Sequence, residues 1–157
     1  MRAATISQLK QELKHRTKEE LLELCLNLTK YKKENKELLT YLLFEASNEL
    51  SYIKDLKTEI DEEFKLINKK TPYLIKKSIR KILRNIKKHI RYSRKKETEV
   101  ELLLYFCTLL KQMTTSIKRN ATLQNIYDRQ IESIKKTVAS LHEDLQYDYE
   151  IELRELE

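Results

Sequence analysis

Residues 100–110 read VELLLYFCTLL, and no other segment of the 157-residue chain constrains the architecture as strongly. The apolar side chains of this segment would project from almost every side of a helix, a pattern typical of a helix buried in the centre of a bundle. Its uncharged run, Leu102–Leu110, is far shorter than the roughly 20 residues that a membrane-spanning helix needs. We therefore expect a helix over Glu97–Ile117 that is almost completely buried around residues 100–110.

The composition favours an all-α protein. The chain has no Gly and one Pro, with 40% hydrophobic and 36% charged residues. Tight hairpin turns, phosphate-binding loops and nucleophile elbows need a residue that tolerates positive φ or a close backbone approach. The P-loop, the dinucleotide-binding motif and the G-x-S-x-G elbow are therefore excluded in their usual forms. We expect five or six helices, stacked as antiparallel hairpins in a bundle or a short α-solenoid-like array.

Capping residues predict where the helices begin. The N-cap candidates are Thr17 with Glu20 as its capping-box partner, Thr71 with Pro72, and Asn120 or Thr122. Such residues accept hydrogen bonds from the free N–H groups of a first helical turn. A long apolar pattern over Glu34–Asn68 predicts a helix that bends near Ser47-Asn48.

The expected organisation is a single all-α domain over residues 1–157. Within it, residues 1–31 form an N-terminal helical hairpin, and residues 143–157 form an acidic C-terminal extension of the last helix.

The net charge of +7 is concentrated in one segment. Residues 69–96 hold 13 Lys/Arg and no Asp/Glu, whereas the segments on either side are net acidic. At about 100° per residue, the isoleucines of this segment share one side of a helix and the cations form a continuous stripe on the other. A cationic stripe attracts polyanions, because binding releases counterions. The candidate polyanion-binding residues are Lys77, Arg80, Lys81, Arg84, Lys87, Lys88 and Arg91.

The stripe also has simpler explanations. The acidic residues 143–157 or the cluster at 59–63 could fold back on it, or it could be merely solvated. An anionic membrane is another possible partner, although the apolar face of the helix is expected to pack in the core. Tyr73 and Tyr92 flank the stripe and could stack on bases, while packing at helix ends is the commoner use of tyrosine.

No residue pattern indicates catalysis. The three histidines, His15, His89 and His142, are scattered. The single E-x-x-H spacing, at His15, lacks the second copy that di-metal bundles use. We expect no enzymatic activity, no catalytic or metal-binding residues and no cofactor.

The two cysteines and the N-terminal segment indicate the compartment. Cys25 and Cys107 lie far apart on apolar helix faces, so we expect two buried, reduced thiols rather than a disulfide. The first ten residues contain no apolar core of signal-peptide length. We therefore expect a cytoplasmic protein without a transmembrane segment.

Four segments resemble a known family. They are LKQEL at 9–13, TKEELLEL at 17–24, KKSIRKI at 76–82 and VELLLY at 100–105. Segments like these occur in the same order in a family of small uncharacterised all-helical bacterial proteins, catalogued as a domain of unknown function. The resemblance implies an all-α fold and a cytosolic bacterial protein, and it implies no activity and no site residues.

These observations predict a non-enzymatic interaction module. Its partner would be an unidentified protein or a second copy of the chain. A second copy could bind through the long helix Glu34–Asn68, whose heptad-like spacing suits an intermolecular coiled coil as well as an intramolecular hairpin. The alternative is sequence-independent nucleic-acid binding through the basic helix 72–95. Nothing in the sequence indicates a small-molecule substrate.

Overall fold

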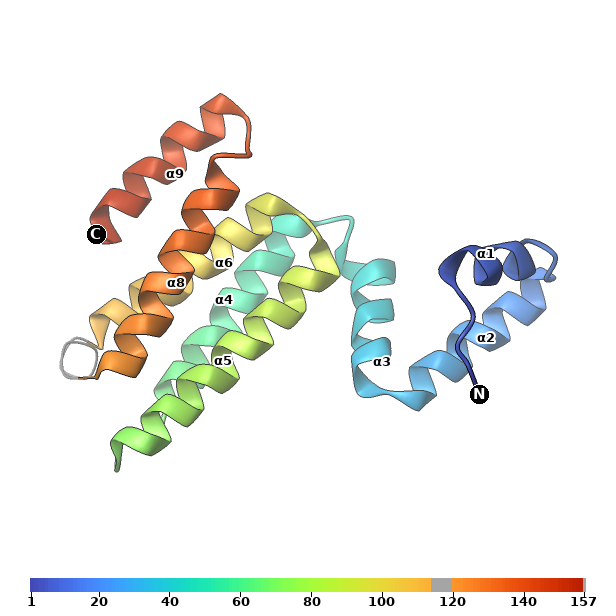
Figure 1. Cartoon of the computed structure of the whole chain (residues 1–157), viewed down its shortest axis with the longest axis horizontal. Helices are drawn as coiled ribbons and strands as arrows, with labels where there is room; N and C mark the ends of the chain where they lie inside the picture. Colours follow the sequence, from blue (N-terminus) through green and yellow to red (C-terminus); the bar gives the residue numbers. More distant parts are fainter. Residues whose placement is uncertain (114–119, 157) are drawn as a thin grey trace. The chain divides into compact units, whose positions relative to one another are not determined.

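The computed structural model of the chain describes residues 1–113 and 120–156 (Figure 1). These residues form helices joined by short connections, with no β-strand among them. They divide into two units, Met1–Phe44 and Glu45–Glu157, where the sequence predicted a single domain. No residue of the three α-helices in the first unit is buried.

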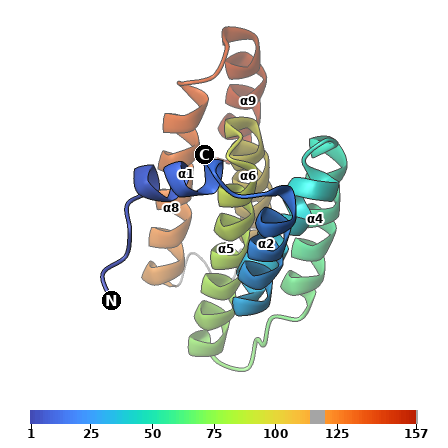
Figure 2. The ribbon, with the colours of Figure 1, turned by 90° about the vertical axis from the view of Figure 1, so that its right-hand side faces the viewer.

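The second unit is built around α6, Lys96–Gln112. The other helices of this unit are α4 (Glu49–Lys65), α5 (Pro72–Ser93), α8 (Ala121–Val138) and α9 (Glu143–Leu156). All four pack against α6. Figures 1 and 2 show α4 and α5 on one side of α6 and α8 and α9 on the other.

The residues that α6 contributes form the centre of the core of the second unit. The buried residues of α6 are Thr98, Val100, Leu102, Leu103, Leu104, Phe106, Cys107 and Leu110. Burying one large apolar side chain stabilises a fold by about 1.5–3 kcal/mol. The helix ends at Gln112, and Ile117, the predicted end, lies outside the described residues.

The predicted caps begin their helices. Thr17 N donates to Glu20 Oε2 at 2.8 Å, and Glu20 N donates to Thr17 Oγ1 at 3.2 Å, so the capping box is confirmed. Leu74 N donates to Thr71 Oγ1 at the start of α5. At the start of α8, Asn120 is the N-cap, rather than Thr122.

The long apolar pattern of residues 34–68 is divided among three elements. They are α3 (Lys33–Thr40), the π-helical turn η1 (Tyr41–Glu45) and α4. Near Ser47-Asn48, where a bend was predicted, the structure has a break instead: Asn48 caps α4, and its Oδ1 accepts from Ser51 N at 3.2 Å. The predicted long helix Glu34–Asn68 is therefore not a single element. In α4 the apolar stripe, including Ile53, is buried within the second unit.

Two further boundaries differ from expectation. The described residues contain eight α-helices, where five or six were predicted. The last predicted helix ends at Val138, and residues 143–156 form a separate helix, α9; Glu157 lies outside the described residues. Gln146 stabilises the turn between the two helices by donating its Nε2 to Leu141 O at 2.8 Å. The apolar spacing of α8 continues into α9, so periodicity did not reveal the break.

The first unit contains three short helices. They are α1 (Ile6–Lys14), α2 (Lys18–Tyr31) and α3, and α2 contacts α3. The helices of the first unit therefore extend beyond residues 1–31, the range predicted for the N-terminal hairpin. Because none of the three helices buries a residue, Cys25 is exposed, which corrects the prediction that both cysteines are buried. Cys107 in α6 is buried.

Candidate functional site

The helix α5 has two faces of different chemistry. Ile79, Ile82 and Ile86 are at most 2% exposed and face the core of the second unit, where α5 contacts α4 and α6. The opposite side carries the seven cationic residues predicted from sequence, from Lys77 to Arg91, which we call the basic face. The 14 steps along the helix from Lys77 to Arg91 correspond to about 21 Å at 1.5 Å per residue. The structure thus places the predicted residues on one surface of one helix.

The cations of the basic face differ slightly in exposure. Lys88 is half-buried, and the other six are exposed. Those six are Lys77, Arg80, Lys81, Arg84, Lys87 and Arg91. Within residues 1–113 and 120–156, no carboxylate lies within ion-pair distance of any of them. Their positive charge is therefore available to an external anion.

The acidic C-terminal helix does not cover the basic face. Within the second unit α9 packs against α6 and α8, and in the described part of the chain no ion pair joins it to α5. One of its carboxylates, Glu150, lies 3.9 Å from Arg154 of the same helix.

The acidic cluster at residues 59–63 is partly engaged elsewhere. Tyr105 OH of α6 donates to Asp61 Oδ1 at 2.6 Å, and Lys65 Nζ lies 2.7 Å from Glu62 Oε1. Asp61 and Glu62 of this cluster thus have partners on α6 or on their own helix.

The two tyrosines near the basic face have different environments. Tyr92 is buried, and its ring lies edge-on to His89 at 5.6 Å between centroids. Nδ1 of His89 lies 2.8 Å from Tyr52 OH. Tyr92 is therefore part of the packing. Tyr73 is 70% exposed, and on a helix with about 100° per residue it falls within the cationic stripe.

A second polar cluster, which sequence analysis missed, lines a hollow of about 440 Å³ among α4, α6 and α9. Lys57 Nζ lies 2.5 Å from Glu101 Oε2 and 5.4 Å from the ring centroid of Tyr105. Tyr149 OH donates to Glu101 Oε1 at 3.3 Å. Burial and the neighbouring carboxylates raise the pKa of Tyr105 and of Tyr149 to about 12. These groups already have partners, so the cluster joins helices and offers few free groups to a ligand.

A third polar cluster joins the corner between α5 and α6 to α4. Ser93 Oγ and Thr98 Oγ1 donate to Glu49 Oε1 at 2.5 and 2.6 Å. Lys95 Nζ lies 3.0 Å from Glu49 Oε2. Glu49 lies more than 40 residues from the other three members in sequence, so no local spacing predicts the cluster.

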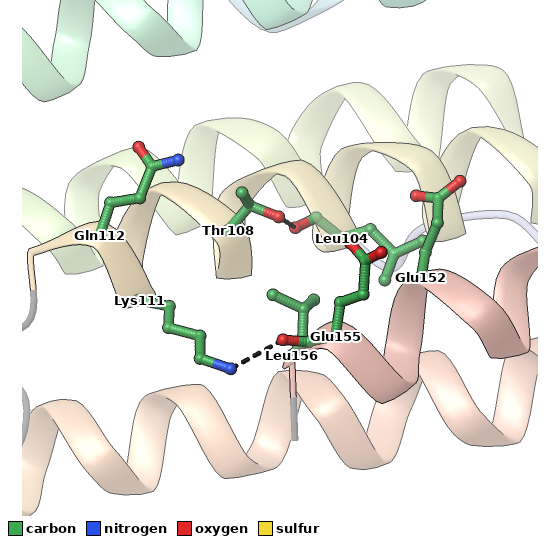
Figure 3. Close-up of a pocket in the computed structure, with 7 residues that line it drawn as sticks. All are labelled: Leu104, Thr108, Lys111, Gln112, Glu152, Glu155 and Leu156. Carbon is green, nitrogen blue, oxygen red and sulfur yellow. Dashed lines mark hydrogen bonds between the residues drawn. The ribbon is translucent and has the colours of Figure 1, made fainter.

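A smaller hollow of about 360 Å³ lies between α6 and α9 (Figure 3). Lys111 Nζ donates to the main-chain oxygen of Glu155 at 2.8 Å, and Thr108 Oγ1 donates to Leu104 O at 3.0 Å. Burial, followed by the charge of Glu101, raises the pKa of Glu152 at its edge. Lys111 and Thr108 thus donate their hydrogen bonds to the protein's own main chain.

The remaining candidate chemistry is dispersed. His15 follows the end of α1, and His142 is exposed with its Nδ1 3.4 Å from Asp144 Oδ2. In the part of the chain that the structure describes, no three His, Cys, Asp or Glu side chains come together as metal ligands would. None of the helices in that part has the length and apolar character required to cross a bilayer.

Comparisons with protein-family models, with curated proteins and with solved structures found no significant match to this chain.

Proposed function

We propose that this chain is a non-enzymatic interaction module whose basic face binds the phosphates of nucleic acid without reading the base sequence. The observation that carries the proposal is the set of six exposed cations on α5 that have no carboxylate partner in the described residues. An array of Lys and Arg with no acidic neighbour is the electrostatic pattern of a phosphate-binding surface.

The scaffold supports this use. Stacked antiparallel helices around the central helix α6 would hold α5 rigid, so that little conformational entropy is lost when the cations bind. Nucleic acid fits better than a membrane surface, because a helix that lies in a bilayer interface inserts its apolar side. Here that side is occupied by Ile79, Ile82 and Ile86, which are buried in the protein.

The direct test is fluorescence anisotropy of labelled duplex DNA and single-stranded RNA, titrated with the protein at increasing salt. If about four cations contact phosphates, the affinity for duplex DNA falls roughly four thousandfold for a tenfold rise in salt. The variant Lys81→Glu/Arg84→Glu/Arg91→Glu should lose most of the binding. Co-sedimentation with anionic vesicles tests the membrane alternative.

The matched control carries the same change in charge away from α5. Lys54, Arg129 and Lys136 are exposed on α4 and α8, so Lys54→Glu/Arg129→Glu/Lys136→Glu should retain most of the affinity. Equal losses in the two triple variants would show that net charge, and not the basic face, causes the binding. Absence of binding at low salt would refute the proposal.

A second function, protein–protein association, is favoured by a different observation. The first unit leaves large apolar side chains exposed on α1 and α2 and in η1, among them Leu9, Leu22, Leu28 and Phe44. Apolar surface gathered in this way marks sites of association. Self-association is the simplest form of this function, and it does not require the basic face.

A further inference from the structure

The helix α2 has far more apolar surface than its own unit covers. Leu22, Leu24, Leu26 and Leu28 are 43–62% exposed, and no residue of the helix is buried. An apolar pattern that covers most of a helix belongs to a helix with neighbours on several sides. Within the first unit only α3 makes extensive contact with α2.

Such a helix needs a partner for its stability. Helices shorter than about 12–15 residues are marginal in water, and most helical stability in proteins comes from tertiary packing. The 14 residues of α2, with none buried, lack that packing. The exposed surface is therefore expected to be covered in the functional state.

The charges along α2 indicate what covers it. At about 100° per residue, Leu22 and Leu26 lie on one side of the helix, with Glu19 and Lys30 beside them near its two ends. In the described residues neither Glu19 nor Lys30 has an ion-pair partner. On the flank that carries Glu19 and Lys30 the surface is thus acidic toward its N-terminal end and basic toward its C-terminal end, while Lys18 falls on the opposite flank of the two leucines.

This arrangement is complementary to itself when two copies run antiparallel. A two-fold axis near the middle of the helix brings Glu19 of each copy opposite Lys30 of the other, while Leu22 and Leu26 of the two copies interdigitate. The helix dipoles are then also antiparallel, which is favourable. Two-fold, self-complementary interfaces are the commonest form of protein oligomer.

We propose that the Glu19–Leu22–Leu26–Lys30 surface of α2 binds the same surface of a second copy of this chain, antiparallel, to form a two-fold homodimer. The inference rests on the association proposed above as the second function, and it is independent of nucleic-acid binding. A pair of 14-residue helices buries less than the roughly 800 Å² per partner of a standard interface, so the dimer is expected to be weak.

The test is a charge exchange followed by sedimentation equilibrium. The wild-type protein should dimerise at micromolar concentrations. Glu19→Lys and Lys30→Glu each place like charges together twice, and each should raise the dimer dissociation constant about tenfold. The double variant Glu19→Lys/Lys30→Glu restores both pairs in reversed order and should recover the wild-type constant. An exposed lysine off this surface, Lys10→Glu, is the control for the charge change.

A second measurement uses the single exposed thiol. Cys25 lies near the middle of α2, so in the antiparallel dimer the two Cys25 side chains lie on the same side of the pair and near the axis. A short bis-maleimide should link them covalently, and Cys25→Ser should abolish the product. Cys107 is buried, and burial raises its pKa to about 12, so it should not react in the folded protein.

The outcomes separate the two levels of the proposal. A wild-type protein that remains monomeric at high concentration would refute self-association altogether. A dimer that ignores both charge reversals, or a double variant that is not rescued, would retain self-association and refute this surface. A partner helix from another protein would be the remaining occupant in the monomeric case.

Discussion

The carboxylate of Glu49 connects three parts of the second unit. It accepts hydrogen bonds from the hydroxyls of Ser93 and Thr98 and lies 3.0 Å from Lys95 Nζ. Thr98 is completely buried, so its hydroxyl cannot turn to water instead. One side chain at the start of α4 therefore satisfies the polar groups at the corner between α5 and α6.

Removing this carboxylate should be costly. Glu49→Ala leaves two hydroxyls without their charged acceptor, and we expect a loss of about 2–4 kcal/mol in the free energy of unfolding. Urea denaturation followed by circular dichroism measures it. The control is Glu62→Ala on the same helix: its pair with Lys65 is exposed on both sides, and such pairs contribute less than about 1 kcal/mol. Equal losses for the two variants would contradict the interpretation.

At the scale of the element, the end of α5 shows how a chain without glycine closes a helix. Arg94 follows the helix with φ 58° and ψ 13°, a left-handed conformation, and its N–H donates to Ile90 O. Glycine is the usual residue at such a position, because a Cβ atom makes this conformation unfavourable.

The substitution Arg94→Gly should therefore stabilise the protein. Relief of the left-handed strain is worth about 1 kcal/mol, partly offset by the greater entropy of glycine in the unfolded chain. Arg94→Ala keeps the Cβ and removes the same charge, so it should not stabilise. Thermal denaturation of the two variants distinguishes the backbone effect from the charge effect; a rise in Tm for both would assign it to charge.

The elements differ in how much of them sequence could predict. Thr17, Thr71 and Asn120 are local features, since a cap and its partner lie within one helical turn, and their positions were predictable. The basic face was predictable for the same reason, because one helix contains it all. The break after Val138 was not predictable. The apolar spacing continues through it, and the turn depends on a hydrogen bond from Gln146 of α9 to Leu141 O.

Apolar spacing along a helix predicted burial correctly only where other helices pack against that helix. The all-round apolar pattern of α6 and the leucines of α2 look alike in sequence, yet α6 is covered by four helices and α2 by few residues. Which apolar surface is covered depends on tertiary contacts, and spacing along one helix does not contain them. The exposure of Cys25 is a consequence of this difference.

At the scale of the whole molecule, a dimer would carry two basic faces. Two linked phosphate-binding surfaces bind a long polyanion more tightly than one, because the second contact is made at a high effective concentration. Dimerisation through α2 should therefore strengthen nucleic-acid binding by the basic face, although each proposal can hold without the other.

The variant Glu19→Lys tests the connection, because it adds positive charge while weakening the dimer. Simple electrostatics predicts tighter binding to DNA. We expect instead weaker binding to a duplex of about 60 base pairs and little change for one of about 12, since only the longer one can engage two faces. Anisotropy at protein concentrations near the dimer dissociation constant makes the comparison. Tighter binding to both duplexes would show that the faces act singly.

The central position of α6 also bears on how the second unit reaches its fold. Each packed pair of helices in this unit joins neighbours or near-neighbours along the chain, with α6 in most of them. Folds whose contacts are close in sequence lose little loop entropy on the way to the transition state, and helical proteins of this kind fold within about microseconds to milliseconds. During synthesis, α4, α5 and α6 emerge before α8 and α9. The half of the core that supports the basic face can therefore assemble on the ribosome while the rest of the chain is still being made.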